Sequence, residues 1–146
     1  MNKIQSAKID ELKRRAIEAI ENKRQDLVEM GDVLLHMPET GFREHRTSAF
    51  VKERLEELGL LVHDGIAISG LKARAEGRSR SRCVGIMGEL DALVFPSHIH
   101  ADGLTGYGHA CGHHAQLPRG RGTAVGLMER GALAALHGDA ASLAAP

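Results

Sequence analysis

The apolar pattern of the chain changes near Gly59, and this change limits the folds that the sequence can adopt. Apolar residues recur at helical spacing from Ser6 to Met37 and again from Glu44 to Leu58. Pro38 ends the first segment, because the residue before a proline is pushed away from helical dihedrals. A polar run at 21–26 predicts a bend within that segment. Gly59 stands where a left-handed cap would end the second helix.

Short apolar segments separated by turn residues follow, and they predict strands. The first two cover Leu60–His63 and Ile66–Ala75, and a turn over Glu76–Arg82 comes next. The third, Cys83–Leu90, is expected to be a buried strand that delivers Asp91 at its carboxyl end. Helices followed by strands predict an α/β domain in which the helices pack on a mixed sheet. Ligand sites in such sheets favour the carboxyl ends of strands.

The last third of the chain is less regular. We expect residues 95–108 to form a loop. The segment Leu117–Gly122 contains one proline and two glycines, which disfavour a helix there. We therefore expect a helix only from Thr123 to Leu136. Residues 140–146 resemble the beginning of a further strand.

Composition excludes several classes of function. With 146 residues the chain forms at most one ordinary domain, and 42% hydrophobic residues are enough for a core. Nineteen basic residues balance nineteen acidic ones, so neither nucleic acid nor an anionic membrane is an expected partner. No apolar run is long enough for a signal peptide or a membrane span. The two cysteines, Cys83 and Cys111, are too few for a disulfide framework, which favours a reducing cytoplasm.

Residues 108–116, Gly-His-Ala-Cys-Gly-His-His-Ala-Gln, carry the most chemistry. Cys111 and His113 are two positions apart, so an extended or looped backbone would point both side chains the same way. Gly112 between them tolerates the unusual dihedrals of a compact turn. A thiolate and an imidazole that converge suit zinc or a similar divalent ion.

A metal centre needs more than two ligands, and several other side chains are candidates. They are His109, His114, Asp91, Glu89, Asp102, His98 and His100. Asp91 could orient a ligand histidine through its second ring nitrogen, or it could cap a turn. By strand alternation Glu89 would line the same cavity, and either acid could bind the metal instead. The alternative is a loop of solvated histidines beside a buried structural thiol.

Three separated stretches together resemble the aminoacylase-type zinc amidohydrolases, which include hippurate, auxin-conjugate and aminobenzoyl-glutamate hydrolases. These stretches are Pro-Glu-Thr-Gly-Phe at 38–42 with Glu44 and Thr47 after it, Gly-Glu-Leu-Asp-Ala-Leu at 88–93, and His-Ala-Cys-Gly-His at 109–113. The third stretch is the most specific, and the order and spacing of all three fit the family. The similarity covers nearly the whole chain, but only about the N-terminal third of such an enzyme.

The resemblance implies that residues 1–146 form the N-terminal part of a zinc-exopeptidase-like catalytic domain, without its lid or dimerisation domain. It implies hydrolysis of the amide bond of N-acyl amino acids, with two zinc or manganese ions in a complete relative. Cys111 and His113 would be metal ligands, and Asp91 would support them. The expected partner is a small N-acyl amino acid or amide. A homo-oligomer is also expected, because an incomplete sheet leaves an unpaired edge.

The sequence also departs from the family. The Glu-Glu pair that supplies the general base and a further ligand does not occur, so we expect little or no activity from these residues alone. His114 stands where many relatives carry Asp or Asn, and the roles of His109 and Glu89 are unassigned. Two alternatives to an amidohydrolase remain open: a truncated inactive remnant, and a small metal-binding or partner-binding module.

Overall fold

A computed structural model describes residues 3–75 and 85–128 of the chain, and its side chains at 7–75 and 85–122. These residues fall into two compact units. Of the described residues, the first unit contains 3–25, 75, 85–86 and 122–128. The second unit contains residues 26–74 and 87–121, and it holds all three of the motifs described above.

The helices predicted from the apolar spacing are confirmed, and the first predicted segment is divided into two helices. Helix α1 (Lys3–Glu21) and helix α2 (Arg24–Leu35) meet at a two-residue turn inside the predicted bend. Helix α3 (His45–Glu56) is followed by Gly59 with a φ of 74°, the left-handed position that the sequence predicts. Across the described ranges, no helix is both long and apolar enough to cross a membrane.

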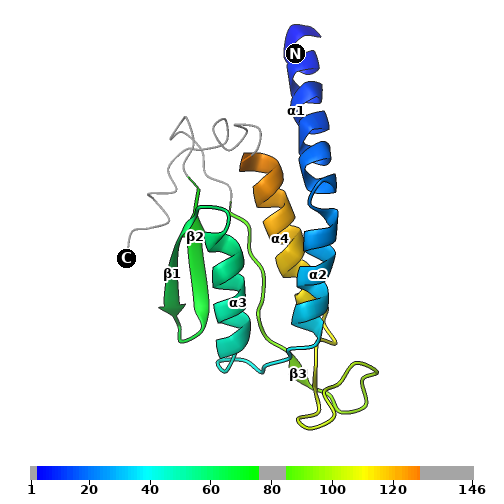
Figure 1. Cartoon of the computed structure of the whole chain (residues 1–146), viewed down its shortest axis with the longest axis vertical. Coiled ribbons are helices and arrows are strands. Elements are labelled where there is room, and N and C mark those ends of the chain that lie inside the picture. Colours follow the sequence, from blue (N-terminus) through cyan, green and yellow to red (C-terminus); the bar gives the residue numbers. More distant parts are fainter. Residues whose placement is uncertain (1–2, 76–84, 129–146) are drawn as a thin grey trace. The chain divides into compact units, whose positions relative to one another are not determined.

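The strands form two short antiparallel pairs. Strand β1 (Leu61–Ile66) pairs with strand β2 (Gly70–Arg74), and this hairpin packs on α3 (Figure 1). Strand β3 (Leu93–Val94) pairs with strand β4 (Tyr107–Gly108). A single parallel bridge joins Thr40 to Ala92. The α/β class is therefore confirmed, although the part of the chain that is described holds no continuous mixed sheet.

The predicted buried strand at 83–90 is wrong for residues 85–90. They have no strand assignment, and Met87 exposes 92% of its surface. A strand needs a neighbouring strand for its backbone hydrogen bonds, and no described strand pairs with this segment. Cys83 and the predicted turn at 76–82 lie outside the described residues.

The predicted late start of the last helix is also wrong. Helix α4 (His113–Met128) begins ten residues before Thr123 and runs through Pro118. Tertiary contacts offset the low helix propensity here, because Leu117 packs against the core and Arg121 reaches the Arg54 carbonyl at 3.4 Å. Residues 129–146, with the rest of the predicted helix and the predicted last strand, lie outside the described residues.

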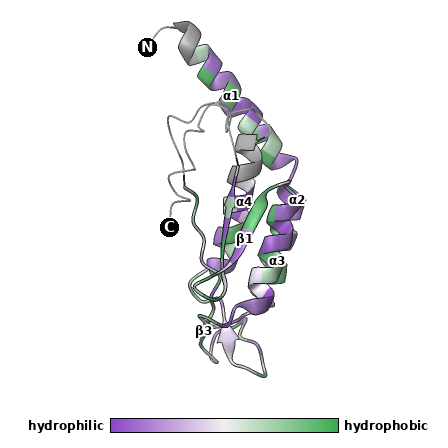
Figure 2. Ribbon diagram, turned by 90° about the vertical axis from the view of Figure 1, so that its left-hand side faces the viewer, coloured by the Kyte–Doolittle hydropathy of each residue, from purple (hydrophilic) through white to green (hydrophobic). Residues whose placement is uncertain are grey.

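The hydrophobic core of the second unit is small. Its buried members are Met30 and Leu34 from α2 and Val51 from α3. Partly buried apolar residues surround them: Met37, Phe50, Leu55, Leu71, Leu90 and Leu117. The helices that supply this core are amphipathic, with purple and green residues mixed along α2 and α3 (Figure 2). The core thus fixes α2, α3 and the start of α4 around the extended segment that carries Asp91.

Glu39 ties the loop before α3 to the same segment. Its carboxylate accepts hydrogen bonds from the backbone N–H groups of Arg46 (3.2 Å) and Thr47 (2.7 Å), at the N-terminus of α3. Its backbone oxygen accepts from Ala92 N at 2.7 Å. Glu39 therefore caps α3 from outside the helix and holds the residue that follows Asp91.

Replacing Glu39 with alanine is expected to lower the free energy of unfolding by about 1 kcal/mol, because two N–H groups of the first turn lose their acceptor. Glu39→Gln is the matched variant, since it keeps an acceptor oxygen. Urea denaturation followed by circular dichroism measures both. Because glutamine keeps only one of the two acceptors, Glu39→Gln should lose part of this stability, and an unchanged Glu39→Ala would contradict the capping role.

Candidate metal centre

A glycine turn positions the thiol and imidazole motif. Gly112 has a φ of 77°, a conformation that favours glycine, and its N–H donates to the His109 carbonyl at 3.1 Å. The unusual dihedral predicted for Gly112 is confirmed. Helix α4 begins at the next residue, so His113 lies in its first turn. The turn therefore separates Cys111, before the helix, from His113, within it.

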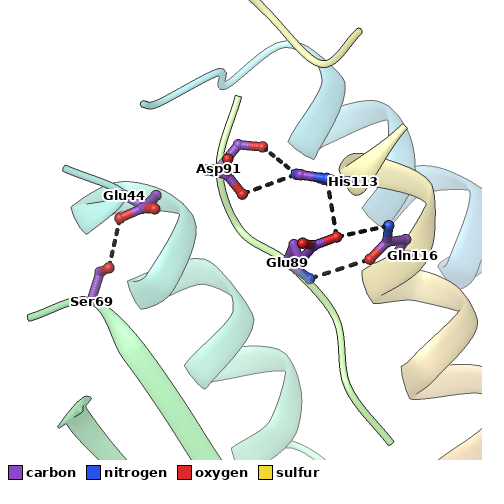
Figure 3. Close-up of polar contacts among 6 residues, drawn as sticks. All are labelled: Glu44, Ser69, Glu89, Asp91, His113 and Gln116. Atoms are coloured by element: carbon purple, nitrogen blue, oxygen red, sulfur yellow. Dashed lines mark hydrogen bonds and ion pairs between the residues drawn. The ribbon is translucent and has the colours of Figure 1, made fainter. Parts of the chain in front are cut away.

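Asp91 contacts His113 through both its backbone and its side chain (Figure 3). The Nδ1 atom of His113 lies 2.8 Å from the Asp91 carbonyl oxygen and 3.0 Å from Oδ1. A carbonyl oxygen can only accept, so this contact places the proton on Nδ1. Nε2 is then the ring nitrogen that can bind a metal ion once the Glu89 carboxylate, 3.1 Å away, has moved from it, as in carboxylate–histidine–metal arrangements.

Glu89 holds the other side of the same imidazole. Its Oε2 atom lies 3.1 Å from His113 Nε2. Gln116, three positions after His113 on the same helix face, donates to Glu89 Oε2 at 3.2 Å and accepts from Glu89 N at 3.4 Å (Figure 3). Leu90 packs against the hydrophobic core instead. The extended segment thus presents both acids to His113, which is the alternation that the sequence predicts.

His109 and His114 lie together beside this group. Their ring centroids are 5.5 Å apart. His109 exposes only 4% of its surface, and neither of its ring nitrogens makes a hydrogen bond. Burial, and then the neighbouring His114 and His113, hold the pKa of His109 below its usual value, while polar contacts with the backbone of Leu34 and Asp91, which are too poorly aligned to be hydrogen bonds, raise it. Burial also lowers the pKa of His114, followed by the charges of nearby histidines.

The donors are of the right chemical types for a metal ion, but they do not form a complete set. Cys111 is a free and exposed thiol, and His113 supplies Nε2. Among the residues that are described, no group of three or more His, Cys, Asp or Glu side chains is placed to hold one ion. The fit is therefore one of donor type, at Cys111 and His113. The alternative of solvated histidines beside a buried thiol is wrong for Cys111, which is exposed, and for His109, which is buried, whereas His100 is exposed as that alternative expects.

The other candidates have contacts of their own. Asp102 accepts at Oδ1 from both the backbone and the hydroxyl of Thr105, so its carboxylate closes a turn. His98 accepts from the backbone N–H of His100 at 3.3 Å. Glu44, which follows the first motif, is buried and accepts from Ser69 Oγ at 2.6 Å (Figure 3).

Sequence reasoning missed three polar roles, those of Gln116, Ser69 and Glu39. Of these, only the role of Gln116 could have been predicted from the sequence, because Gln116 lies about one helical turn after His113. The partners of Ser69 and Glu39 are far from them in sequence or across a loop, so spacing alone could not identify them.

Comparison with known proteins places the chain among hydrolases. It is 32% identical over 109 residues to a probable hydrolase of Synechocystis, a match that covers 72% of this chain and 28% of that protein. It is 33% identical over 82 residues to a putative amidohydrolase of Bacillus subtilis, covering 53% and 21% of the two chains. No protein-family model and no solved structure matches the chain.

Amidohydrolases are among these relatives. An N-acyl-L-amino acid amidohydrolase of Geobacillus stearothermophilus is 33% identical over 90 residues, which are 60% of this chain and 24% of that enzyme. Over the matched segment the chain is similar to amidohydrolases, which confirms the resemblance seen in the sequence. The chain spans about a quarter of the length of these relatives.

Proposed function

We propose that this chain contributes to a metal-dependent centre that hydrolyses the amide bond of N-acyl amino acids, within a zinc-exopeptidase-like fold. The observation that carries the proposal is the double contact of Asp91 with His113 Nδ1, at 2.8 Å and 3.0 Å. A metal-ligating histidine commonly donates its second ring N–H to a carboxylate or carbonyl. The substrate class follows the relative from Geobacillus stearothermophilus.

Each residue has a distinct part in the proposed centre. Cys111 would bind a zinc or manganese ion as a thiolate, and His113 would bind it through Nε2. Asp91 would fix the tautomer and the direction of the imidazole ring. A bound divalent ion would lower the pKa of a coordinated water to about 7 and polarise the amide carbonyl.

Glu89 must move for His113 to bind metal in this way, because its carboxylate lies against Nε2. Gln116 has hydrogen bonds to both the backbone and the carboxylate of Glu89. It can therefore keep Glu89 beside the centre after a metal ion has replaced the carboxylate at Nε2. Both described carboxylates beside His113, those of Glu89 and Asp91, are in contact with its ring. A general base for the attacking water is therefore not assigned within the described residues.

Cobalt binding tests the metal centre. Reduced protein with added Co²⁺ is expected to show a thiolate-to-cobalt charge-transfer band, because Cys111 would be a direct ligand. Cys111→Ser should remove the band, and Cys83→Ser, which changes the other cysteine, should keep it. A wild-type chain without the band, at excess ion, would contradict the assignment of Cys111.

Turnover separates hydrolysis from binding alone. Release of the amino acid from an N-acetyl-L-amino acid, with zinc or manganese added, would support amide hydrolysis if Cys111→Ser abolishes it. The expected turnover is small, because no general base is assigned within the described residues. Metal binding without any turnover would favour the metal-binding module instead.

A further inference from the structure

We propose that His109 and His114 form a second site for a divalent transition-metal ion, bound through two imidazoles and separate from Cys111 and His113. The proposal goes beyond the hydrolytic centre and does not depend on it. It starts from three ring nitrogens that are buried and make no hydrogen bond: Nδ1 and Nε2 of His109, and Nδ1 of His114. Buried polar groups of this kind are destabilising unless another partner satisfies them.

The spacing of the two rings fits a shared ion. With metal–nitrogen bonds of about 2.0–2.1 Å, each ring centroid lies roughly 3.2 Å from the metal. A tetrahedral angle between the bonds then separates the centroids by about 5.2 Å. The observed separation is 5.5 Å, with the ring planes at 51°. The separation of the rings is therefore compatible with one shared ion.

The surroundings favour a metal over a carboxylate partner. The carboxylates of Glu89 and Asp91 are both in contact with His113. His98 lies close to the backbone next to His109, since a Cβ atom added at Gly108 would be 3.4 Å from His98 Nδ1. Among the described residues, no third donor is placed to complete the site. Water or a further side chain would therefore complete the coordination of a zinc-like ion when it binds.

Zinc titration by calorimetry tests the proposal in a triple variant, Cys83→Ser/Cys111→Ser/His113→Gln. This background removes both thiols and the proposed catalytic ligand, so failure of the hydrolytic centre cannot affect the result. We expect one zinc ion per chain. Adding His114→Ala should weaken binding about tenfold or more, while His63→Ala, at an exposed histidine on β1, should leave it unchanged.

His114 rather than His109 is substituted, because His114 is only half-buried. His109→Ala would remove a buried side chain and could unfold the chain. Circular dichroism confirms that each variant is folded. Zinc binding that is equally tight after His114→Ala would overturn the proposal. So would a folded background that binds no zinc, which would leave an ordered water as the partner of the two rings.

Discussion

Replacing Leu34 with alanine is expected to lower the free energy of unfolding by about 2–5 kcal/mol. Leu34 is fully buried, at 0% exposure, and it lies between Met30 and Val51 in the core of the second unit. The substitution removes apolar contacts and leaves a cavity that the helices on either side can close only in part. Because few side chains are fully buried here, each one accounts for a large share of the stability.

Val33→Ala is the control for this prediction. Val33 precedes Leu34 on α2 and exposes 43% of its surface, so its loss removes little buried area. Alanine also has a higher helix propensity than valine, which should offset part of any cost. Urea denaturation of the two variants measures the difference. Equal midpoints for Leu34→Ala and Val33→Ala would contradict the placement of the core.

The features that the sequence predicts well are those that depend on neighbouring residues. The helices up to Glu56 follow from apolar spacing, and the positive φ values of Gly59 and Gly112 follow from the turns they occupy. The shared face of Glu89 and Asp91 follows from the alternation of an extended backbone. In each case the physical cause lies within a few positions of the residue.

The features that it does not predict depend on distant partners. Residues 85–90 are apolar enough for a strand, but pairing requires a neighbour that the sequence cannot locate. Helix α4 continues through Pro118 because its contacts with other elements outweigh local propensity. His109 differs from the other histidines only by burial, which arises from packing rather than from the motif.

Removing the Asp91 carboxylate is expected to weaken metal binding about 10–100-fold, if the proposed centre is correct. Asp91→Ala leaves the backbone carbonyl at 2.8 Å from His113 Nδ1 but removes the oxygen at 3.0 Å. The ring loses one of its two restraints, and its Nε2 becomes a weaker donor to the ion. Competition with a chromogenic zinc chelator measures the affinity.

Glu89→Gln is the matched comparison, because it removes the same charge two residues away and contacts the same imidazole from the opposite side. If Asp91 acts by orienting His113, only Asp91→Ala weakens binding, and Glu89→Gln leaves the affinity unchanged or raises it by freeing Nε2. If the two acids merely attract a cation through their charge, both variants weaken binding to a similar extent. That second result would remove the orienting role from Asp91, and with it the main structural support for His113 as a metal ligand.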